Sequence, residues 1–576
     1  MSNENGHANA QEKPCLVQAG QGFSVLYKGR YLYSRYNPSR AIVQTVEALP
    51  LIANTLILCA SPCLCYGFAE LAEKMPDGCF LLGLEADAML YELAKTELPK
   101  LQSKHSRLLQ SAALLHSDEL LAIVSILTNS KAHDCTLPPI YSFRRAIIVE
   151  MSGGVAFNVE LYRKLAFAAE DTIATFWKNR LTLTKFGRLY ARNLFKNLAR
   201  LPKSVPLAQL EKQVQQPILL FGAGESAETT LTALPRAVFK QLYVIAVDAA
   251  LPILRAHGIT PNCVVAVESQ LAIEKAYIGN TSVTPLILAD SLSRVQVTTH
   301  TRGKVSYFTS DYTTASFLRA LDEQKLLPPT VPPLGSVGLT ATYLALRLRA
   351  SDNVPVFVTG LDFSFSLGKT HARAAPAHTL RLTQANRLLP TQNIDAAFKC
   401  GAHRKQGKSG EIFTDIALTS YASQFTSNFA AAKNLYDVGK TGLPLGIVRI
   451  GETELLAFIT HLAQPTSVQA LQETRDATTA ATAYSSEHII AFLSQEQTAL
   501  ERLKALLMYG EAASSSTLTA QEEIAMLLKP REYLYLHFPD GYECKATDIS
   551  FLKRVRSEID FFLKDITRSL LAITQN

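Results

Sequence analysis

Short apolar runs, each ending in a glycine or a carboxylate, recur through the middle of the chain. They occupy residues 217–221, 243–247, 264–267 and 354–359. An apolar run of this length that stops at a turn signal predicts a buried strand, and the stretches between these runs have helical patterning. Strands that alternate with helices predict a doubly wound, parallel α/β sheet, whose ligands bind beyond the carboxyl ends of the strands.

Small and polar residues follow the runs closely. They are Gly222, Gly224, Glu225, Ser226, Asp248, Glu268, Gly360 and Asp362. Glycines let a phosphate approach the N–H groups of a helix N-terminus, and carboxylates accept hydrogen bonds from ribose hydroxyls or a base. Turns need glycine in any case, so a plain structural turn is the alternative interpretation. The repetition of strand followed by polar group favours a nucleotide site.

Ser336 is a second candidate for a phosphate-binding residue. The proline-rich residues 328–333 form a stiff segment that leads into Gly335-Ser336-Val337-Gly338, where a helix is expected to begin. A serine at this position either caps the helix or binds a ligand phosphate, and the residues alone leave both open.

The flanking segments predict further domains. Residues 55–61 and 79–85 indicate a second, smaller α/β unit, residues 155–201 form a long helical stretch, and the chain after residue 451 is mostly helical. We therefore expect an N-terminal α/β domain at 1–154, a helical bridge at 155–205, a central Rossmann-like domain at 206–450 and a helical domain at 451–576. The first turn of the smaller unit, at Ser61, lacks glycines and is expected to serve as a scaffold.

Composition narrows the class of protein. The 576 residues are too many for one core, and 57 basic against 50 acidic residues give a net charge of +7 without a basic stripe. A nucleic-acid-binding protein is not supported. The nine scattered cysteines suggest free thiols, and neither a zinc-binding pattern nor an apolar run long enough to span a membrane is visible. These features predict a cytoplasmic protein.

Five phrases in this order resemble the central domain of the motility accessory factor (Maf) family, which are flagellin glycosyltransferases. They lie at residues 222–226, 258–262, 335–337, 360–362 and 368–372. More distantly, the same order is similar to bacterial sialyltransferases that use CMP-activated sialic acid, and to archaeal 6-hydroxymethylpterin pyrophosphokinase-like proteins. Phrases at residues 34–38 and 176–180 also resemble Maf proteins, so the resemblance covers most of the chain.

The resemblance implies an activity. The chain would transfer a nonulosonic acid, such as pseudaminic or legionaminic acid, from a CMP-activated donor to a Ser or Thr hydroxyl of flagellin. No cofactor would be required, because the CMP-sugar is a substrate. The resemblance places Ser336 on the nucleotide, and it places Asp248 and Glu268 where the sialyltransferases have nucleotide-contacting asparagines.

The general base is expected among the histidines of residues 363–410, a polar segment predicted to be a long loop or lid. His371 is the first candidate because it lies in a phrase that resembles Maf proteins, and His403 is the second. Histidine suits this task because its usual pKa, near 6.5, leaves the imidazole largely neutral in the cytoplasm.

Two departures from the family pattern keep alternatives open. Glu225 stands where relatives have proline, and no histidine precedes Thr414-Asp415 as it does in the sialyltransferases. One alternative is an ATP-dependent pyrophosphokinase acting on hydroxymethylpterin, with Asp248, Glu268 and Asp362 holding a metal ion. The other is a flagellin-binding chaperone without catalytic activity.

Overall fold

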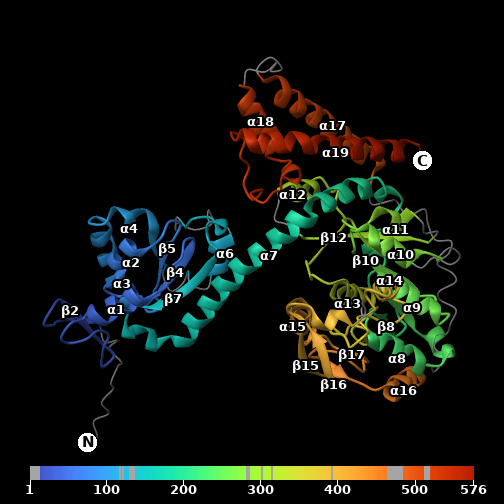
Figure 1. Cartoon of the computed structure of the whole chain (residues 1–576), viewed down its shortest axis with the longest axis horizontal. Coiled ribbons are helices and arrows are strands. Elements are labelled where there is room, and N and C mark those ends of the chain that lie inside the picture. The colour runs from blue at the N-terminus through green and yellow to red at the C-terminus, as the bar shows by residue number, and fades with distance from the viewer. Residues whose placement is uncertain are drawn as a thin grey trace, which may run out of the picture. The chain divides into compact units, whose positions relative to one another are not determined.

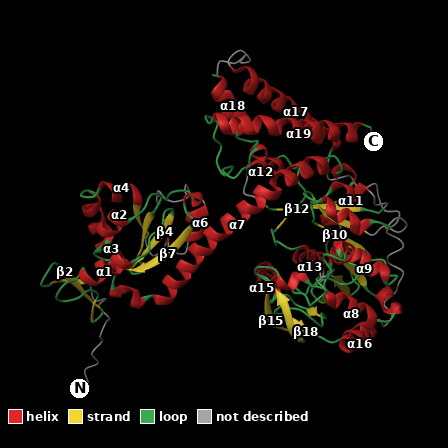
Figure 2. Cartoon of the chain, in the orientation of Figure 1, coloured by secondary structure: helices red, strands yellow, loops and turns green. Residues whose placement is uncertain are grey.

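The computed structural model describes residues 13–115, 119, 122–128, 137–279, 286–299, 303–312, 316–390, 394–462, 484–510 and 519–575. The chain divides into two compact units, Met1–Lys185 and Phe186–Asn576. In both units helices pack around strands, as Figures 1 and 2 show.

The first unit holds a four-stranded parallel sheet in the order β6-β5-β4-β7 and a three-stranded antiparallel sheet, β1-β2-β3. Its strands are β1 (Cys15–Gln18), β2 (Phe23–Tyr27), β3 (Arg30–Tyr31), β4 (Thr55–Ala60), β5 (Phe80–Leu84), β6 (Ala112–Leu115) and β7 (Arg145–Glu150). Its helices are α1 (Arg40–Ala48), α2 (Phe68–Lys74), α3 (Ala88–Gln102), α4 (Ser106–Ser111), α6 (Ile123–Thr128) and the beginning of α7 (Val159–Leu198).

The second unit is built on a nine-stranded sheet in which every neighbouring pair of strands is parallel, in the order β13-β12-β11-β10-β9-β8-β14-β17-β18. The strands are β8 (Ile218–Phe221), β9 (Tyr243–Val247), β10 (Cys263–Ala266), β11 (Leu286–Asp290), β12 (Val305–Ser310), β13 (Thr330–Val331), β14 (Val356–Thr359), β17 (Leu435–Asp437) and β18 (Val448–Arg449). A separate antiparallel hairpin joins β15 (His403–Gly407) to β16 (Gly410–Thr414).

The helices of this unit follow the strands in sequence. They are α8 (Glu225–Ala233), α9 (Leu251–Ala256), α10 (Glu274–Tyr277), α11 (Val295–Thr299), α12 (Ser316–Glu323), α13 (Val337–Leu348), α14 (Pro376–Gln384), α15 (Ile416–Phe429) and α16 (Glu452–Leu462), and then the C-terminal helices α17 (Ser486–Tyr509), α18 (Ala520–Leu528) and α19 (Ile549–Thr574).

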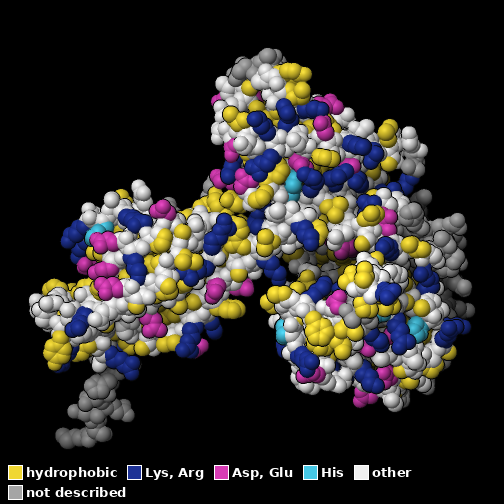
Figure 3. Space-filling model, viewed as in Figure 1, with side chains coloured by type: hydrophobic (Ala, Val, Ile, Leu, Met, Phe, Trp, Pro, Cys, Tyr) yellow, Lys and Arg dark blue, Asp and Glu magenta, His cyan; other side chains and the backbone are white. Residues whose placement is uncertain are grey.

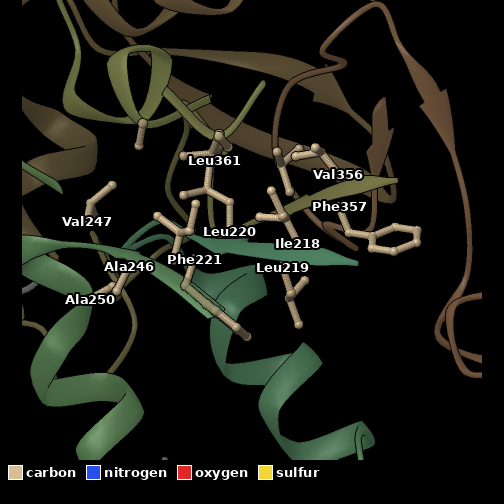
Figure 4. Close-up of a cluster of buried hydrophobic side chains, with 14 of the residues drawn as sticks. Ile218, Leu219, Leu220, Phe221, Ala246, Val247, Ala250, Val356, Phe357 and Leu361 are labelled. Atoms are coloured by element: carbon tan, nitrogen blue, oxygen red, sulfur yellow. The ribbon is translucent and has the colours of Figure 1, made fainter. Parts of the chain in front are cut away.

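The central strands are almost entirely apolar because helices cover both faces of a parallel sheet. All four residues of β8 are buried, as are all four of β14. Figure 4 shows Leu220 and Phe221 of β8 packed among Ala246, Val247 and Leu361. The apolar runs therefore form the core of the second unit.

The order of the strands creates a switch point between β8 and β14. From β8 the chain adds strands successively out to β13 on one side, and it then returns to place β14 on the other side of β8. The loops that leave β8 and β14 consequently diverge, which opens a crevice at the carboxyl ends of these two strands.

Helix α7 reaches into the second unit, where two of its asparagines hold the ends of the sheet strands. The Asn193 side-chain amide donates to the carbonyls of Ser269 and Leu292, and that of Asn197 donates to the carbonyls of Ser291 and Ser293. Arg192 forms an ion pair with the buried Asp565 of α19 at 2.5 Å. These contacts tie the C-terminal helices and the sheet to one helix.

The predicted doubly wound α/β class with a helical C-terminal region is confirmed. The three boundaries at 154, 205 and 450 stay predictions, and the two compact units of the structure meet at residue 185. Strands β11 and β12 were not predicted: β11 is an apolar run that ends in Asp290, whereas serine and threonine interrupt the apolar residues of β12. It also treated residues 363–410 as a loop, whereas they contain α14 and β15.

The sequence also predicted free thiols, the lack of a membrane-spanning segment and a surface without a basic stripe. The eight cysteines that the structure describes are free, and Cys59, Cys63 and Cys65 are buried. In the described part of the chain, none of the helices combines the length and the apolar character that crossing a bilayer would need. Figure 3 shows Lys and Arg side chains interspersed with Asp and Glu over the visible face, without a single basic stripe.

Candidate functional site

A pocket of about 390 Å³ opens at the carboxyl ends of β8 and β14, at the switch point. Its volume falls in the range of roughly 300–1,000 Å³ that is typical of small-molecule sites. The lining residues come from the turns after β8, β9 and β14, from the beginnings of α13 and α15, and from residues 370–402. They include Gly222, Gly224, Ser336, Gly360, Asp362, His371, Arg381, Lys399 and Asp415.

The two glycines after β8 are required by close packing against the turn after β14. A Cβ atom on Gly222 would lie 2.3 Å from the carbonyl oxygen of Gly360, and one on Gly224 would lie 2.6 Å from Asp362 Oδ2. The N–H groups of these glycines donate to the carbonyls of Thr359 and Gly360, both at 2.8 Å. Both glycines line the pocket, but their N–H groups already have protein partners.

Asp362 occupies the N-terminus of α8. Its carboxylate accepts hydrogen bonds from the N–H of Ser226, at 2.9 Å, and from the Ser226 hydroxyl. That hydroxyl in turn accepts a bond from the N–H of Gly360 at 2.9 Å. Burial raises the pKa of Asp362 to about 6, although the bonds from Ser226 oppose the shift. A carboxylate of the protein itself thus takes the place at α8 where a ligand phosphate was expected.

Helix α13 also contributes its N-terminus to the pocket, and within the described residues the side chain that caps it is a neutral one. Ser336 is the N-cap, and its hydroxyl accepts a bond from the N–H of Gly338 at 3.3 Å. Ser336, Val337 and Gly338 all line the pocket. The first-turn N–H groups of a helix have no intrahelical partner, and the helix dipole favours negative charge beside them. The 12-residue α13 therefore offers the better phosphate site.

Two cationic residues contribute to the lining of the pocket. Arg381 of α14 and Lys399 line it, and Asp415 is the N-cap of α15. Asp415 accepts a hydrogen bond from the N–H of Leu418 at 2.8 Å, so its carboxylate, like that of Asp362, compensates a helix N-terminus. The sequence analysis did not single out Arg381, Lys399 or Asp415 as site residues, because nothing in their local pattern ties them to the strands.

His371 lines the pocket and is held in the neutral state. Burial lowers its pKa to about 4, and the positive charge of Arg381 adds to this effect, as does that of His378 when it is protonated. Its Nδ1 lies 3.2 Å from the hydroxyl oxygen of Thr370. A neutral imidazole that is oriented through Nδ1 can accept a proton at Nε2.

Several predicted residues lie outside the pocket lining. Glu225 accepts a hydrogen bond from Ser366 at 2.5 Å and pairs with Lys369 at 3.2 Å, so it turns away from the pocket and fastens the loop after β14 to α8. His403 is exposed on β15, next to the lining residue Ala402. The structure therefore separates the two candidate bases and keeps only His371 in the pocket.

Asp248 and Glu268 end neighbouring strands but do not line the pocket either. Asp248 is 2% exposed, and its Oδ1 accepts the N–H of Ala249 at 2.7 Å. Burial raises its pKa to about 7, with a contribution from the charge of Glu268 and opposition from nearby backbone N–H groups. Glu268 accepts the N–H of Gln270 at 2.9 Å. Among the described residues we find no cluster of His, Cys, Asp and Glu suited to a metal ion.

The first unit has its own switch point, between β4 and β7, and its side chains fill it. Glu85, which is 1% exposed, accepts hydrogen bonds from Ser61 at 2.9 Å and from Tyr162 at 3.3 Å. Ser61 has a positive φ of 48°, and a Cβ atom on Gly154 would lie 2.3 Å from its hydroxyl oxygen. The scaffold or protein-docking role of the smaller unit stays a prediction.

Comparisons with known proteins address the same region. A family model described as 6-hydroxymethylpterin diphosphokinase MptE-like matches residues 192–368. This range holds β8 to β14, and it confirms the predicted similarity to the pterin enzymes. Nine of the 23 residues that line the pocket, His371 among them, lie beyond its end.

Two comparisons cover nearly the whole chain. A solved structure of a Maf glycosyltransferase from Magnetospirillum magneticum AMB-1 is similar over 99% of this chain and 93% of that chain, at 12% identity and a TM-score of 0.48. A protein of Treponema pallidum (strain Nichols), described as uncharacterized, is 32% identical over 569 residues, which are 96% of this chain and 95% of the relative. The chain therefore belongs to the same family as this Treponema pallidum protein, and it carries a central MptE-like domain.

Proposed function

We propose that the chain is a glycosyltransferase that moves a nonulosonic acid from a CMP-activated donor to a Ser or Thr hydroxyl of flagellin. One observation carries the proposal: the pocket at the switch point is lined both by the N-terminus of α13, whose cap is the neutral Ser336, and by neutral His371 together with Arg381 and Lys399. Two of the phrases that resemble Maf proteins contribute to this lining, one through Ser336 and Val337 and the other through His371.

The donor phosphate would bind at Ser336, Val337 and Gly338, where helix N–H groups and the dipole stabilise its negative charge. This charge grows when the bond from the anomeric carbon to the phosphate oxygen breaks and the electron pair leaves with CMP. Arg381 and Lys399 add positive charge to the same pocket, so the pocket stabilises the departing group more strongly than the intact donor.

His371 would accept the proton of the attacking hydroxyl. The acceptor oxygen forms the new bond to the anomeric carbon, and its proton passes to Nε2 while Thr370 orients Nδ1. Burial and the neighbouring positive charge of Arg381 hold the pKa of His371 at about 4, and His378 adds to the shift when it is protonated. An anionic donor compensates those charges, so donor binding raises this pKa towards the range in which a general base is effective.

The second candidate is pyrophosphoryl transfer from ATP to a hydroxymethylpterin. It is favoured by the description of the family that matches residues 192–368. We place it second because His371, Arg381, Lys399 and Asp415 contribute to the pocket from outside that range. The carboxylate of Asp362, which it would need for a metal ion, is engaged by Ser226.

Titration calorimetry of the purified protein separates the candidates. Saturable binding of CMP without added metal is expected, and Ser336→Ala should weaken it because the cap and one phosphate contact are lost. Binding of ATP with magnesium, and not of CMP, would transfer the assignment to the pyrophosphokinase. If neither nucleotide binds, a non-catalytic flagellin-binding protein is the function that remains.

The general base is tested by transfer of the sugar to flagellin, followed by mass spectrometry. His371→Ala should bind CMP as the wild type does and should lose transfer. The matched control is His403→Ala, since this second histidine is exposed and lies outside the pocket lining. Normal transfer by the His371 variant would disprove the assignment, and loss of transfer in the control would move it to His403.

A further inference from the structure

The β15–β16 hairpin starts and ends at the rim of the pocket. Ala402, which precedes β15, lines the pocket, and so does Asp415, which follows β16. The first residue of β15 pairs with the last residue of β16, His403 with Thr414, so the open end of the hairpin lies at the pocket. Figure 1 places β15, β16 and α15 in the same lobe.

The closed end of the hairpin is fixed to the central sheet. Lys408 in the turn forms an ion pair with Asp437 of β17 at 2.6 Å, and their side chains are only 3% and 4% exposed. The N–H of Lys408 also donates to the carbonyl of Gly442 at 2.8 Å. A hairpin held at both ends is a rigid template rather than a moving lid.

One edge of this hairpin is already paired. Phe413 of β16 exchanges two backbone hydrogen bonds with Phe365, at 2.8 and 2.9 Å. Because backbone groups along a strand point alternately to its two sides, Ile412 and Thr414 face β15, where they are opposite Lys405 and His403. β16 therefore has a neighbour on both sides.

The outer edge of β15 is the edge of the hairpin that has no neighbouring strand among the described residues. Since His403 and Lys405 use their backbone groups inside the hairpin, the N–H and C=O groups of Arg404 and Gln406 point outwards. Within the described ranges no hydrogen bond of these four groups is recorded. Residues 403–406 are all exposed, and Arg404 and Lys405 make the strand basic.

We propose that β15 binds an extended, acidic segment of the acceptor polypeptide as an added strand and delivers a Ser or Thr hydroxyl from it into the pocket. Strand addition of this kind gains its affinity from main-chain hydrogen bonds, here to Arg404 and Gln406. Lys405 supplies the charge that selects acidic neighbours of the acceptor residue, and Arg404 adds to it by exchanging its exposed ion pair with Glu411, at 3.4 Å, for one with the bound segment. The distance from Gln406 to Ala402 is about 14 Å along a strand, so a segment of about five residues spans it.

The acceptor role rests on the proposed function, whereas binding of a strand to β15 is measurable without it. Exposed basic residues on an edge also discourage unwanted pairing, which would explain Arg404 and Lys405 without any partner. A substitution that removes an outward N–H but leaves the hairpin ladder intact separates these two explanations.

Gln406→Pro is that substitution, because proline is tolerated in a strand where its missing N–H would face solvent. The matched control, Gln406→Ala, removes the side chain and keeps the N–H. With purified flagellin monomer from the same organism as the probe, Gln406→Pro should raise KM for flagellin about tenfold or more through the lost hydrogen bond and the steric block, and the control should stay within twofold. Calorimetric affinity for CMP should be unchanged in both variants.

Equal KM values for Gln406→Pro and the wild type would overturn the proposal. Loss of CMP binding by the proline variant would mean that the hairpin is disrupted. The double variant Arg404→Glu, Lys405→Glu then provides the test, because it keeps the backbone hydrogen bonds between β15 and β16. Its KM should also rise about tenfold, and an unchanged KM would refute the acidic-segment assignment. If the wild type fails to bind CMP, the proposed function fails, and direct titration of flagellin still tests strand addition with the same variants.

Discussion

Glu85 gives the first unit a pH-dependent stability that can be worked out from its surroundings. Its side chain accepts hydrogen bonds from Ser61, Tyr162 and the N–H of Asp87, but burial is the dominant effect and raises its pKa from 4.5 to about 7. Between these two values the folded unit holds a proton that the unfolded chain has lost. The stabilising effect is therefore complete below about pH 4.5 and is lost as the pH rises through 7.

The difference between a pKa of 4.5 and one of about 7 corresponds to roughly 3 kcal/mol of unfolding free energy. We expect Glu85→Gln to remove this dependence. The amide oxygen can accept from Tyr162 and from the N–H of Asp87, and its NH₂ group can donate to the Ser61 hydroxyl, so glutamine reproduces the protonated acid at every pH. At pH 8 the variant should be more stable than the wild type, and near pH 4 the two should be equal.

Trp177 reports on this unit alone, because it is the only tryptophan of the chain and lies in α7 before residue 185. Its Nε1 donates to the carbonyl of Phe143 at 2.6 Å, and the guanidinium of Arg144 lies 3.4 Å from its ring centre. Denaturant titrations followed by tryptophan fluorescence between about pH 4 and pH 8 measure the effect, with the exposed Glu92→Gln as control. Equal pH slopes for Glu85→Gln and the wild type would refute the reasoning.

Three further outcomes are expected in the second unit. Gly224→Ala should abolish CMP binding without unfolding the first unit, because the new Cβ would lie 2.6 Å from Asp362 Oδ2; calorimetry that shows wild-type affinity would contradict the packing argument. Lys408→Met should destabilise the second unit by about 3–5 kcal/mol, since it leaves Asp437 buried without its partner, and adding Asp437→Leu should restore most of the loss in chemical unfolding. Ser336→Ala should lower the free energy of unfolding by about 1 kcal/mol, because the N-cap of α13 is lost. If CMP affinity falls only as far as the smaller fraction of folded protein explains, Ser336 acts as a cap and does not contact the nucleotide.

The sequence by itself determined the strands and the general place of the site. A run such as residues 218–221 is apolar throughout because both faces of its strand are covered, and its end is marked by Gly222. These signals are local, which is why the α/β class, the helix that begins after Ser336 and the pocket residue Asp362 could be predicted from the pattern of the chain. His371 was a candidate only through the resemblance to Maf proteins. The run at β11 carries the same signal as β8, whereas β12 alternates apolar residues with serine and threonine.

Only the tertiary structure decided what those residues do. Asp362 lies 136 positions from Ser226, yet its carboxylate closes the N-terminus of α8, which leaves α13 as the helix that can receive an anion. Glu225, which stands where relatives have proline, pairs with Lys369, 144 positions further along the chain. Arg381 and Lys399 line the pocket although they lie beyond β14 in the sequence, because the strand order places that segment against the switch point. Such contacts depend on the pairing of strands that are far apart in the sequence, and this pairing cannot be predicted from the local pattern of residues.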